Sequence, residues 1–321
     1  MAVPNESDAR RLDAAAVAMS LRRLAHEPQP APWLHREIAR RMAQRLEIIK
    51  LQPELVIDWW SNLGAGAEVL RQAYPKARRV AVEPDAAWVR RTPSVANSPR
   101  WWSPERWVGR LGDAPPPVLT AADELPSGAQ LVWANMMLHA VVDPPRLFEQ
   151  WHSLLRVDGF VMFSCLGPGT LAELRALYAR LGWPAPTPGF VDMHDLGDML
   201  VRAGFADPVM DQETLTLLYD SPEALLAELR SLGGNAAPDR FAGLRTPRWR
   251  ERLLRGLDAA RRPDGKLALS FEVAYGHAFK AAPRLRPGEA TAIPLDDMKA
   301  MVRSRRDAGS GDGRGGAETV R

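Results

Sequence analysis

VIDWWSNLGAGAEVL, residues 56–70, joins a short apolar run to a glycine-containing turn and then to a helical pattern. The apolar residues 55–57 predict a buried strand, Asp58 follows them directly, and a helix is expected to begin near Gly64. A strand, a tight turn and a helix in this order are typical of the ligand-binding edge of an α/β sheet. The turn is unusual, because Trp60 stands where a glycine is expected.

Strands and helices alternate along most of the chain, which indicates a mainly parallel sheet with right-handed crossovers. The predicted strands are 55–58, 79–83, 130–134 and 160–165, with an extended stretch at 208–219. The predicted helices are 33–51, 64–74, 145–156, 170–181, 193–203, 222–232 and 248–260, and a shorter helical pattern lies around 12–24. The run LALSFEVAYGHAF (267–279) alternates apolar and polar residues after a turn, so an antiparallel final strand is expected.

The chain divides into three parts by composition. Residues 1–31 form a polar N-terminal segment, and residues 32–283 are expected to form the folded domain, with a mostly helical insertion at about 168–265. Residues 284–321 are of low complexity with little to bury, and we expect them to be disordered.

Composition excludes several classes of protein. The 321 residues are 46% hydrophobic, enough for a sizeable core, and a net charge of +3 arises from 42 basic and 39 acidic residues spread along the chain. We therefore expect no nucleic-acid partner. Neither a signal peptide nor an apolar run of roughly 18–20 residues occurs, so a cytoplasmic protein without a membrane span is expected. A single cysteine, Cys165, excludes a disulfide framework and a multi-cysteine zinc site, and no metal is expected.

Polar side chains follow three of the predicted strands. Asp58 follows the first strand, Glu83 closes the second and Asn135 follows the strand 130–134, and the carboxyl ends of parallel strands meet at one edge of the sheet. A glutamate there accepts hydrogen bonds from both hydroxyls of a ribose. The turn SNLGAG lacks the G-x-G-x-x-G spacing that a pyrophosphate requires, so a cofactor without phosphate is expected.

Three further segments carry a resemblance to a known family. They are LVWANMMLHAVVDPPRLFEQWHSLLRVDGFVMFSCLGPGTLAELR (131–175), VDMHDLGDMLVRAGFADPVMDQETLTLLYDSPEALLAELRSLGGNA (191–236) and LSFEVAYGHAFK (269–280). They resemble the malonyl-acyl-carrier-protein O-methyltransferases of biotin synthesis, which are class I S-adenosylmethionine-dependent methyltransferases. The resemblance implies a Rossmann-like α/β fold: a mainly parallel seven-stranded sheet with an antiparallel C-terminal strand and helices on both faces.

The resemblance also implies S-adenosylmethionine as cofactor and malonyl-loaded acyl carrier protein as substrate. The cofactor-binding residues expected are Asp58, Asn62, Gly64, Glu83, Asp123 and Asn135, of which Asp123 lies in the family-like stretch AADELP. Trp60 and Asn62 replace the first two glycines of the family's turn D-x-G-x-G-x-G, and Gly64 retains the third. His139 is the candidate catalytic residue, facing the reacting groups; alternatively, it is a helix-start residue bonded to the backbone.

Two other functions stay open at this level. One is a methyltransferase of another small substrate, and the other is a catalytically degenerate methyltransferase-like protein that works through partner contacts. Trp60 discriminates between them, because an indole in the cleft blocks a cofactor whereas an indole under the sheet does not. A carboxylate substrate is already an ionised nucleophile, so no general base is expected. Arg245, Arg248 and Arg250 are either a basic surface for an acidic carrier protein or a solvated helix start.

Overall fold

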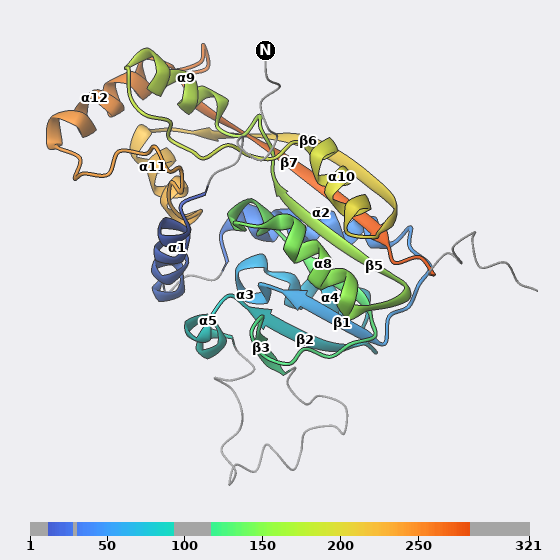
Figure 1. Cartoon of the computed structure of the whole chain (residues 1–321). Helices are drawn as coiled ribbons and strands as arrows, with labels where there is room; N and C mark the ends of the chain where they lie inside the picture. The colour runs from blue at the N-terminus through green and yellow to red at the C-terminus, as the bar shows by residue number, and fades with distance from the viewer. Residues whose placement is uncertain (1–11, 28–30, 93–116, 283–321) are drawn as a thin grey trace, which may run out of the picture. The chain divides into compact units, whose positions relative to one another are not determined.

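The computed structural model describes residues 12–27, 31–92 and 117–282, and the predicted disordered tail 284–321 lies outside them (Figure 1). Seven strands form one sheet in the order β3-β2-β1-β4-β5-β7-β6. Their bounds are β1 Leu55–Trp59, β2 Arg78–Glu83, β3 Val118–Thr120, β4 Ala129–Ala134, β5 Leu155–Leu166, β6 Ala206–Tyr219 and β7 Leu267–Phe279. Strands β1 to β5 pair in parallel, and β7 pairs antiparallel with both β5 and β6. The predicted fold class is confirmed, including the antiparallel final strand.

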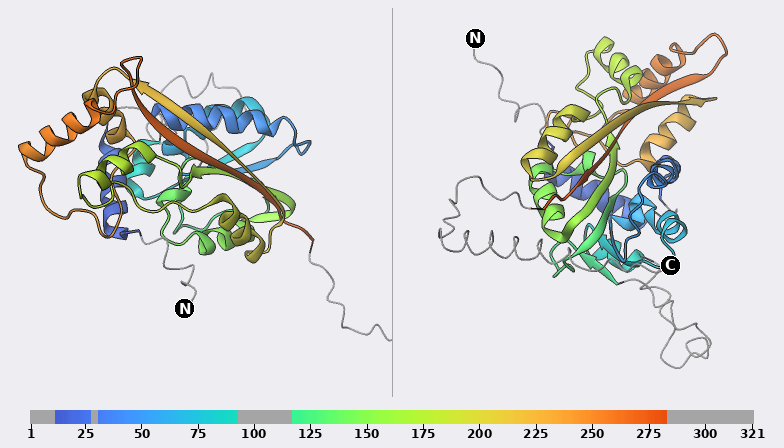
Figure 2. Two further views of the ribbon diagram at one scale, coloured as in Figure 1. Left: turned by 90° about the horizontal axis from the view of Figure 1, so that it is seen from above. Right: turned by 90° about the vertical axis from the view of Figure 1, so that its right-hand side faces the viewer.

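The helices cover both faces of this sheet (Figures 1 and 2). Their bounds are α1 Ala14–His26, α2 Trp33–Leu46, α3 Ser61–Gly64, α4 Gly66–Ala73, α5 Ala86–Arg91, α8 Pro144–Leu154, α9 Ala172–Arg180, α10 Met193–Arg202, α11 Pro222–Ser231 and α12 Pro247–Asp258, with a 3₁₀ turn, η2, at Leu138–Ala140. The side chains of neighbouring strand residues point to opposite faces of the sheet. Val56 packs with residues of α2, whereas Ile57 packs in the cluster that contains residues of α8 and α10. The central strands are therefore buried on both sides.

Short polar residues fix the helix starts. The N-cap side chains that accept backbone N–H groups are Asp13 (α1), Asp85 (α5), Asp143 (α8), Asp192 (α10), Ser221 (α11) and Thr246 (α12). In α8, α11 and α12 a proline follows the cap, where its missing N–H costs no helical bond. Among the described residues, no helix combines the length and the apolar character needed to cross a membrane.

Several elements differ from the sequence-based prediction. Helix α2 ends at Leu46 rather than at residue 51, and the helix expected from Gly64 is divided into α3 and α4 by the left-handed Ala65. The three-residue strand β3 was missed, because a run of three residues after consecutive prolines carries no readable periodicity. Strand β5 begins at Leu155 rather than at Phe160, so α8 ends earlier than predicted. Leu155 is buried and pairs with Ala129 of β4 across an irregularity in the register, a long-range contact that overrides the helical pattern.

Helix α1 is tied to the segment that joins α11 to α12. The Asp13 backbone N–H donates to the Ala236 carbonyl at 2.8 Å, and the Asp13 carboxylate pairs with Arg240 at 2.7 Å. The Arg23 guanidinium donates to the Gly233 carbonyl at 2.6 Å. Helix α1, which lies where a short helical pattern was predicted in the polar N-terminal segment, thus contributes to the wall of the site described next.

Candidate functional site

The candidate site lies where the sheet order reverses, at the carboxyl ends of β1 and β4. Asp58, in β1, is 1% exposed, and its Oδ2 accepts a hydrogen bond from the Ser61 hydroxyl at 2.6 Å. Its Oδ1 is buried and has no hydrogen-bond partner among the described residues. Burial raises the pKa of Asp58 to about 6. A Cβ on Gly66 would lie 2.5 Å from this Oδ1, so the close approach of α4 requires glycine there.

Glu83 ends the neighbouring strand β2 and is completely buried. Its Oε1 accepts hydrogen bonds from the Asn62 backbone N–H at 3.0 Å and the Thr92 hydroxyl at 2.8 Å, while its Oε2 has no partner among the described residues. Burial is the main cause that raises the pKa of Glu83 to about 8, and the nearby charge of Asp58 adds to it. Asp58 and Glu83 therefore lie at the carboxyl ends of adjacent strands, and each has one carboxyl oxygen without a hydrogen-bond partner among the described residues.

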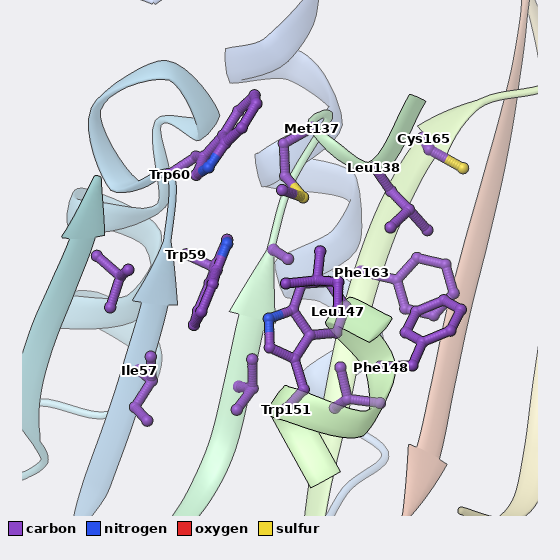
Figure 3. Packing of buried hydrophobic residues seen from close by; sticks show 14 of the residues in the cluster. Ile57, Trp59, Trp60, Met137, Leu138, Leu147, Phe148, Trp151, Phe163 and Cys165 are labelled. Carbon is purple, nitrogen blue, oxygen red and sulfur yellow. The ribbon is translucent and has the colours of Figure 1, made fainter. Parts of the chain in front are cut away.

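Trp60 lies at the carboxyl end of β1 and not under the sheet (Figure 3). Its backbone is left-handed, with φ of 53°, and its N–H donates to the Val82 carbonyl at 2.6 Å. The preceding residue, Trp59, packs on the face of the sheet, its ring 5.9 Å from that of Trp151. Trp60 is 9% exposed and lines a cavity together with Leu63. The indole thus occupies the edge of the sheet where a cofactor is expected.

The side chain of Asn135 supports the site through hydrogen bonds to three neighbouring segments. Its side-chain amide donates to the carbonyls of His35 at 2.8 Å and Gly64 at 2.6 Å, and its Oδ1 accepts from the Ser164 hydroxyl at 2.7 Å. Ser164 in turn accepts the Met136 N–H at 3.1 Å. This fully buried network joins α2, the glycine turn, β4 and β5, and it leaves the amide of Asn135 occupied by the protein itself.

The other two predicted site residues lie in different surroundings. His139, in η2, is half-buried and lines the cavity, its ring 6.3 Å from that of Phe190 and its Nδ1 3.5 Å from the Leu166 nitrogen. Asp123 is exposed and accepts hydrogen bonds from the backbone and hydroxyl of Thr120, at 2.7 and 2.9 Å. His139 therefore lies in the wall of the cavity, whereas Asp123 stabilises the turn 120–123 and does not line the cavity.

The cavity itself has a volume of about 680 Å³ and is mostly apolar. Its lining comes from the carboxyl ends of β1 and β4, from α1 and α9, from the loop 186–190 and from α11 and α12. Sequence reasoning missed the contributions of α1, Phe190 and Trp249, since only the tertiary packing brings these segments together. Neither Asp58 nor Glu83 lines the cavity. The turn that covers these two acids does, through Trp60 and Leu63. Within residues 12–27, 31–92 and 117–282, no group of three potential metal-ligating side chains occurs.

The buried carboxyl group of Glu83 gives a testable pH dependence. The folded state holds a proton on Glu83 up to about pH 8, whereas the unfolded chain loses it near the ordinary glutamate pKa of 4.5, so the free energy of unfolding falls as pH rises between these values. Burial lowers the pKa of His35 to about 4 and raises that of Asp58 to about 6. Both groups are therefore deprotonated in the folded state above pH 6.5, where Glu83 determines most of the pH dependence of stability. We expect the free energy of unfolding of the wild-type protein to fall by about 2 kcal/mol between pH 6.5 and 8. The substitution Glu83→Gln should abolish this fall.

Urea unfolding at pH 6.5, 7.2 and 8 measures this difference. The matched control is Glu68→Gln, because Glu68 is an exposed acid whose pKa is lowered by Arg71 and Gln72. Equal slopes for wild-type protein and Glu83→Gln would show that Glu83 is already ionised in the folded state.

Known proteins resemble this chain in sequence and in structure. Residues 33–207 match the methyltransferase domain family. The chain is 37% identical over 286 residues to the malonyl-[acyl-carrier protein] O-methyltransferase of Gallionella capsiferriformans, covering 88% of this chain and 96% of that protein. It is 39% identical over 280 residues to the protein of that name from Laribacter hongkongensis, covering 85% and 92%. The YcgJ protein from Bacillus subtilis superposes with a TM-score of 0.50 at 11% identity, covering 76% of this chain and 99% of that one, which supports the fold alone.

Proposed function

This chain belongs to the malonyl-[acyl-carrier protein] O-methyltransferase family, and from that membership we propose that it methylates the free carboxylate of malonyl-acyl carrier protein with S-adenosylmethionine as donor. The product is the malonyl methyl ester, made at an early step of biotin synthesis. Esterification removes the negative charge, so that enzymes of chain elongation accept the acyl group. We place the reaction in the cytoplasm, with no membrane or nucleic acid taking part.

The observation that carries this proposal is the cavity beside the carboxyl ends of β1 and β4. Its volume of about 680 Å³ lies within the range typical of sites for small molecules and cofactors. Its lining is mostly apolar, and His139 and His35 supply polar groups near the sheet. A displacement reaction between two bound groups gains from such orientation and from the exclusion of water.

The residues at the sheet edge fit the proposed cofactor chemically. Once Glu83 is ionised, its unpartnered Oε2 is an acceptor for ribose hydroxyls, and the unpartnered Oδ1 of Asp58 is an acceptor beside the glycine turn. We propose that Asp58, Glu83 and the turn residues Asn62 and Gly64 hold the cofactor. Asn135 supports them by fixing the carbonyl of Gly64, so its contribution is made through the turn.

Two further residues complete the proposed assignment. Asp123, placed by the family-like stretch that surrounds it, is proposed to face the adenine ring. His139 is proposed to lie beside the carboxylate that reacts.

When bound, S-adenosylmethionine supplies a methyl group on a cationic sulfur, which leaves as a neutral thioether when a carboxylate oxygen takes the methyl carbon. The protein needs no general base, since a malonyl carboxylate is ionised at neutral pH. The apolar walls keep water away from the carboxylate and the methyl group. His139 orients the carboxylate, and its neighbour Phe190 packs against the edge of the imidazole.

Methyl transfer to malonyl-acyl carrier protein tests the proposal directly. Purified protein is incubated with S-adenosylmethionine and malonyl-acyl carrier protein, and mass spectrometry follows the gain of one methyl ester. Acetyl-acyl carrier protein is the matched control, because it lacks the free carboxylate. We expect methylation of the malonyl form alone.

Two other outcomes point to the alternatives. Binding of S-adenosylmethionine in calorimetry without methylation of malonyl-acyl carrier protein would favour a methyltransferase of another small substrate. A folded protein that binds no S-adenosylmethionine at millimolar concentration would favour the degenerate interaction protein, and the position of Trp60 makes this measurement the first to perform.

His139→Ala is expected to lower kcat/KM for malonyl-acyl carrier protein by about 10- to 100-fold, the size of effect that loss of orientation produces. The affinity for S-adenosylmethionine should change little. His194→Ala is the control, since His194 is an exposed residue of α10 paired with Asp192 and does not line the cavity. An unchanged kcat/KM in His139→Ala would remove His139 from the reaction.

A further inference from the structure

The charged side chains that line the cavity, among the described residues, are all basic. Among the described residues that line it, three are arginines, namely Arg230, Arg245 and Arg250, and none is an aspartate or a glutamate. None of the three forms a side-chain hydrogen bond or an ion pair with another described residue. A cationic cavity wall without a protein counter-charge suits an anionic ligand.

Of these arginines, Arg245 lies against aromatic rings. Its guanidinium carbon lies 3.9 Å from the ring centre of Phe241 and 4.6 Å from that of Trp249, and Trp183 is 5.9 Å away. Trp183 and Trp249 also pack against each other at 5.1 Å. A guanidinium that stacks on rings keeps its N–H groups, which lie in its own plane, available for the oxygens of a phosphate or carboxylate.

Arg230 lies in α11, Arg250 in α12 and Arg245 in the segment that joins these helices, whereas Trp60 and His139 lie at the carboxyl ends of β1 and β4. The carboxylate that accepts the methyl group must reach the sheet edge. An anion bound at Arg245 would therefore be a second anion on the same ligand, separated from the reacting carboxylate by an uncharged stem. The apolar lining between the two groups fits such a stem.

We propose that Arg245 binds the phosphate of the phosphopantetheine arm that carries the malonyl group. This inference rests on the proposed function. On an acyl carrier protein the acyl group is a thioester at one end of an uncharged pantetheine stem, and a phosphate lies at the other end. A malonyl thioester on this arm carries an anion at each end, as the cavity requires. Arg230 and Arg250 add positive charge near the same phosphate.

Calorimetry of the full-length protein with 4′-phosphopantetheine and with pantetheine tests this subsite without any methyl transfer. We expect wild-type protein to prefer the phosphorylated arm by about 10- to 100-fold, the range for hydrogen bonds to a charged group. Arg245→Gln should reduce the preference to near unity, and Arg245→Lys should keep part of it. Equal affinities of wild-type protein for the two arms would overturn the proposal, as would a preference that survives in a folded Arg245→Gln protein.

Kinetics with small substrates separate this subsite from the docking of the carrier protein. The ratio of kcat/KM for malonyl-phosphopantetheine to that for malonyl-pantetheine should fall about tenfold or more in Arg245→Gln. Arg248→Gln is the matched control, because Arg248 is an exposed arginine of the first turn of α12 that does not line the cavity, and it should retain the wild-type ratio. A ratio lowered equally by both substitutions would assign the effect to general positive charge. Absence of methyl transfer with every substrate would contradict the proposed function, while the calorimetric preference would still decide the role of Arg245.

Discussion

Replacing Trp60 by glycine is expected to tighten the binding of S-adenosylmethionine by about tenfold or more, a gain of about 1.4 kcal/mol. The turn that contains Trp60 covers Glu83, whose carboxylate accepts the Asn62 N–H and is completely buried. Trp60 and Leu63 line the cavity, whereas Glu83 does not. A cofactor that reaches Glu83 has to displace the indole, and a glycine removes that cost.

The same substitution has two opposite effects on stability. Loss of a buried tryptophan costs about 3–5 kcal/mol. A glycine at φ of 53° recovers about 1–2 kcal/mol, because the left-handed conformation is costly for a residue with a Cβ. We therefore expect Trp60→Gly to unfold at a lower temperature than the wild-type protein without ligand, and to gain more from saturating S-adenosylmethionine.

Calorimetric titration and thermal unfolding, with and without ligand, check both parts. The control is Trp59→Phe, because Trp59 packs against Trp151 on the face of the sheet and does not line the cavity. This variant should lose stability without a change in affinity. A folded Trp60→Gly protein that binds no more tightly than wild-type protein would show that the indole already lies outside the path of the cofactor. Binding by Trp60→Gly alone would identify the natural chain as one whose turn blocks its cofactor.

Local patterns were sufficient to predict most of the sheet. Apolar runs that end in polar residues marked β1, β2 and β4, and a turn instead of a crossover before residue 267 indicated the antiparallel direction of β7. These features depend on neighbours in sequence. The start of β5 depends on the pairing of Leu155 with Ala129, and its prediction was wrong for that reason.

The site was predictable where one element alone determines a side chain's position. Asp58 and Glu83 end parallel strands, so their presence at one edge follows from strand order. The aromatic cluster around Arg245 was not predictable, because Phe241, Trp183 and Trp249 come from different segments that only packing brings together. The same holds for Asn135, whose partners lie on α2, on the turn and on β5.

Asn135→Asp is expected to destabilise the protein by about 3–5 kcal/mol, a large part of the total stability of a typical domain. The amide nitrogen of Asn135 donates to the carbonyls of His35 and Gly64, at 2.8 and 2.6 Å. An aspartate would bring a buried carboxylate oxygen against these two carbonyl oxygens and would leave both without a donor. Since Gly64 belongs to the turn above Asp58 and Glu83, the turn should loosen together with the fold.

The pH dependence of this loss distinguishes charge from a mere change of packing. A buried aspartate against two carbonyls has a raised pKa, so the folded state binds its proton more tightly than the unfolded chain, and the stability of Asn135→Asp should fall relative to wild-type protein as pH rises from 5 to 8. Urea unfolding across this range measures it. Asn235→Asp is the matched control, since Asn235 donates a single exposed hydrogen bond to the Ala185 carbonyl and should lose less than about 1 kcal/mol. A loss in Asn135→Asp as small as that of the control would mean that the turn is held by its other contacts, such as the bond from His35 Nδ1 to the Leu63 carbonyl at 2.9 Å.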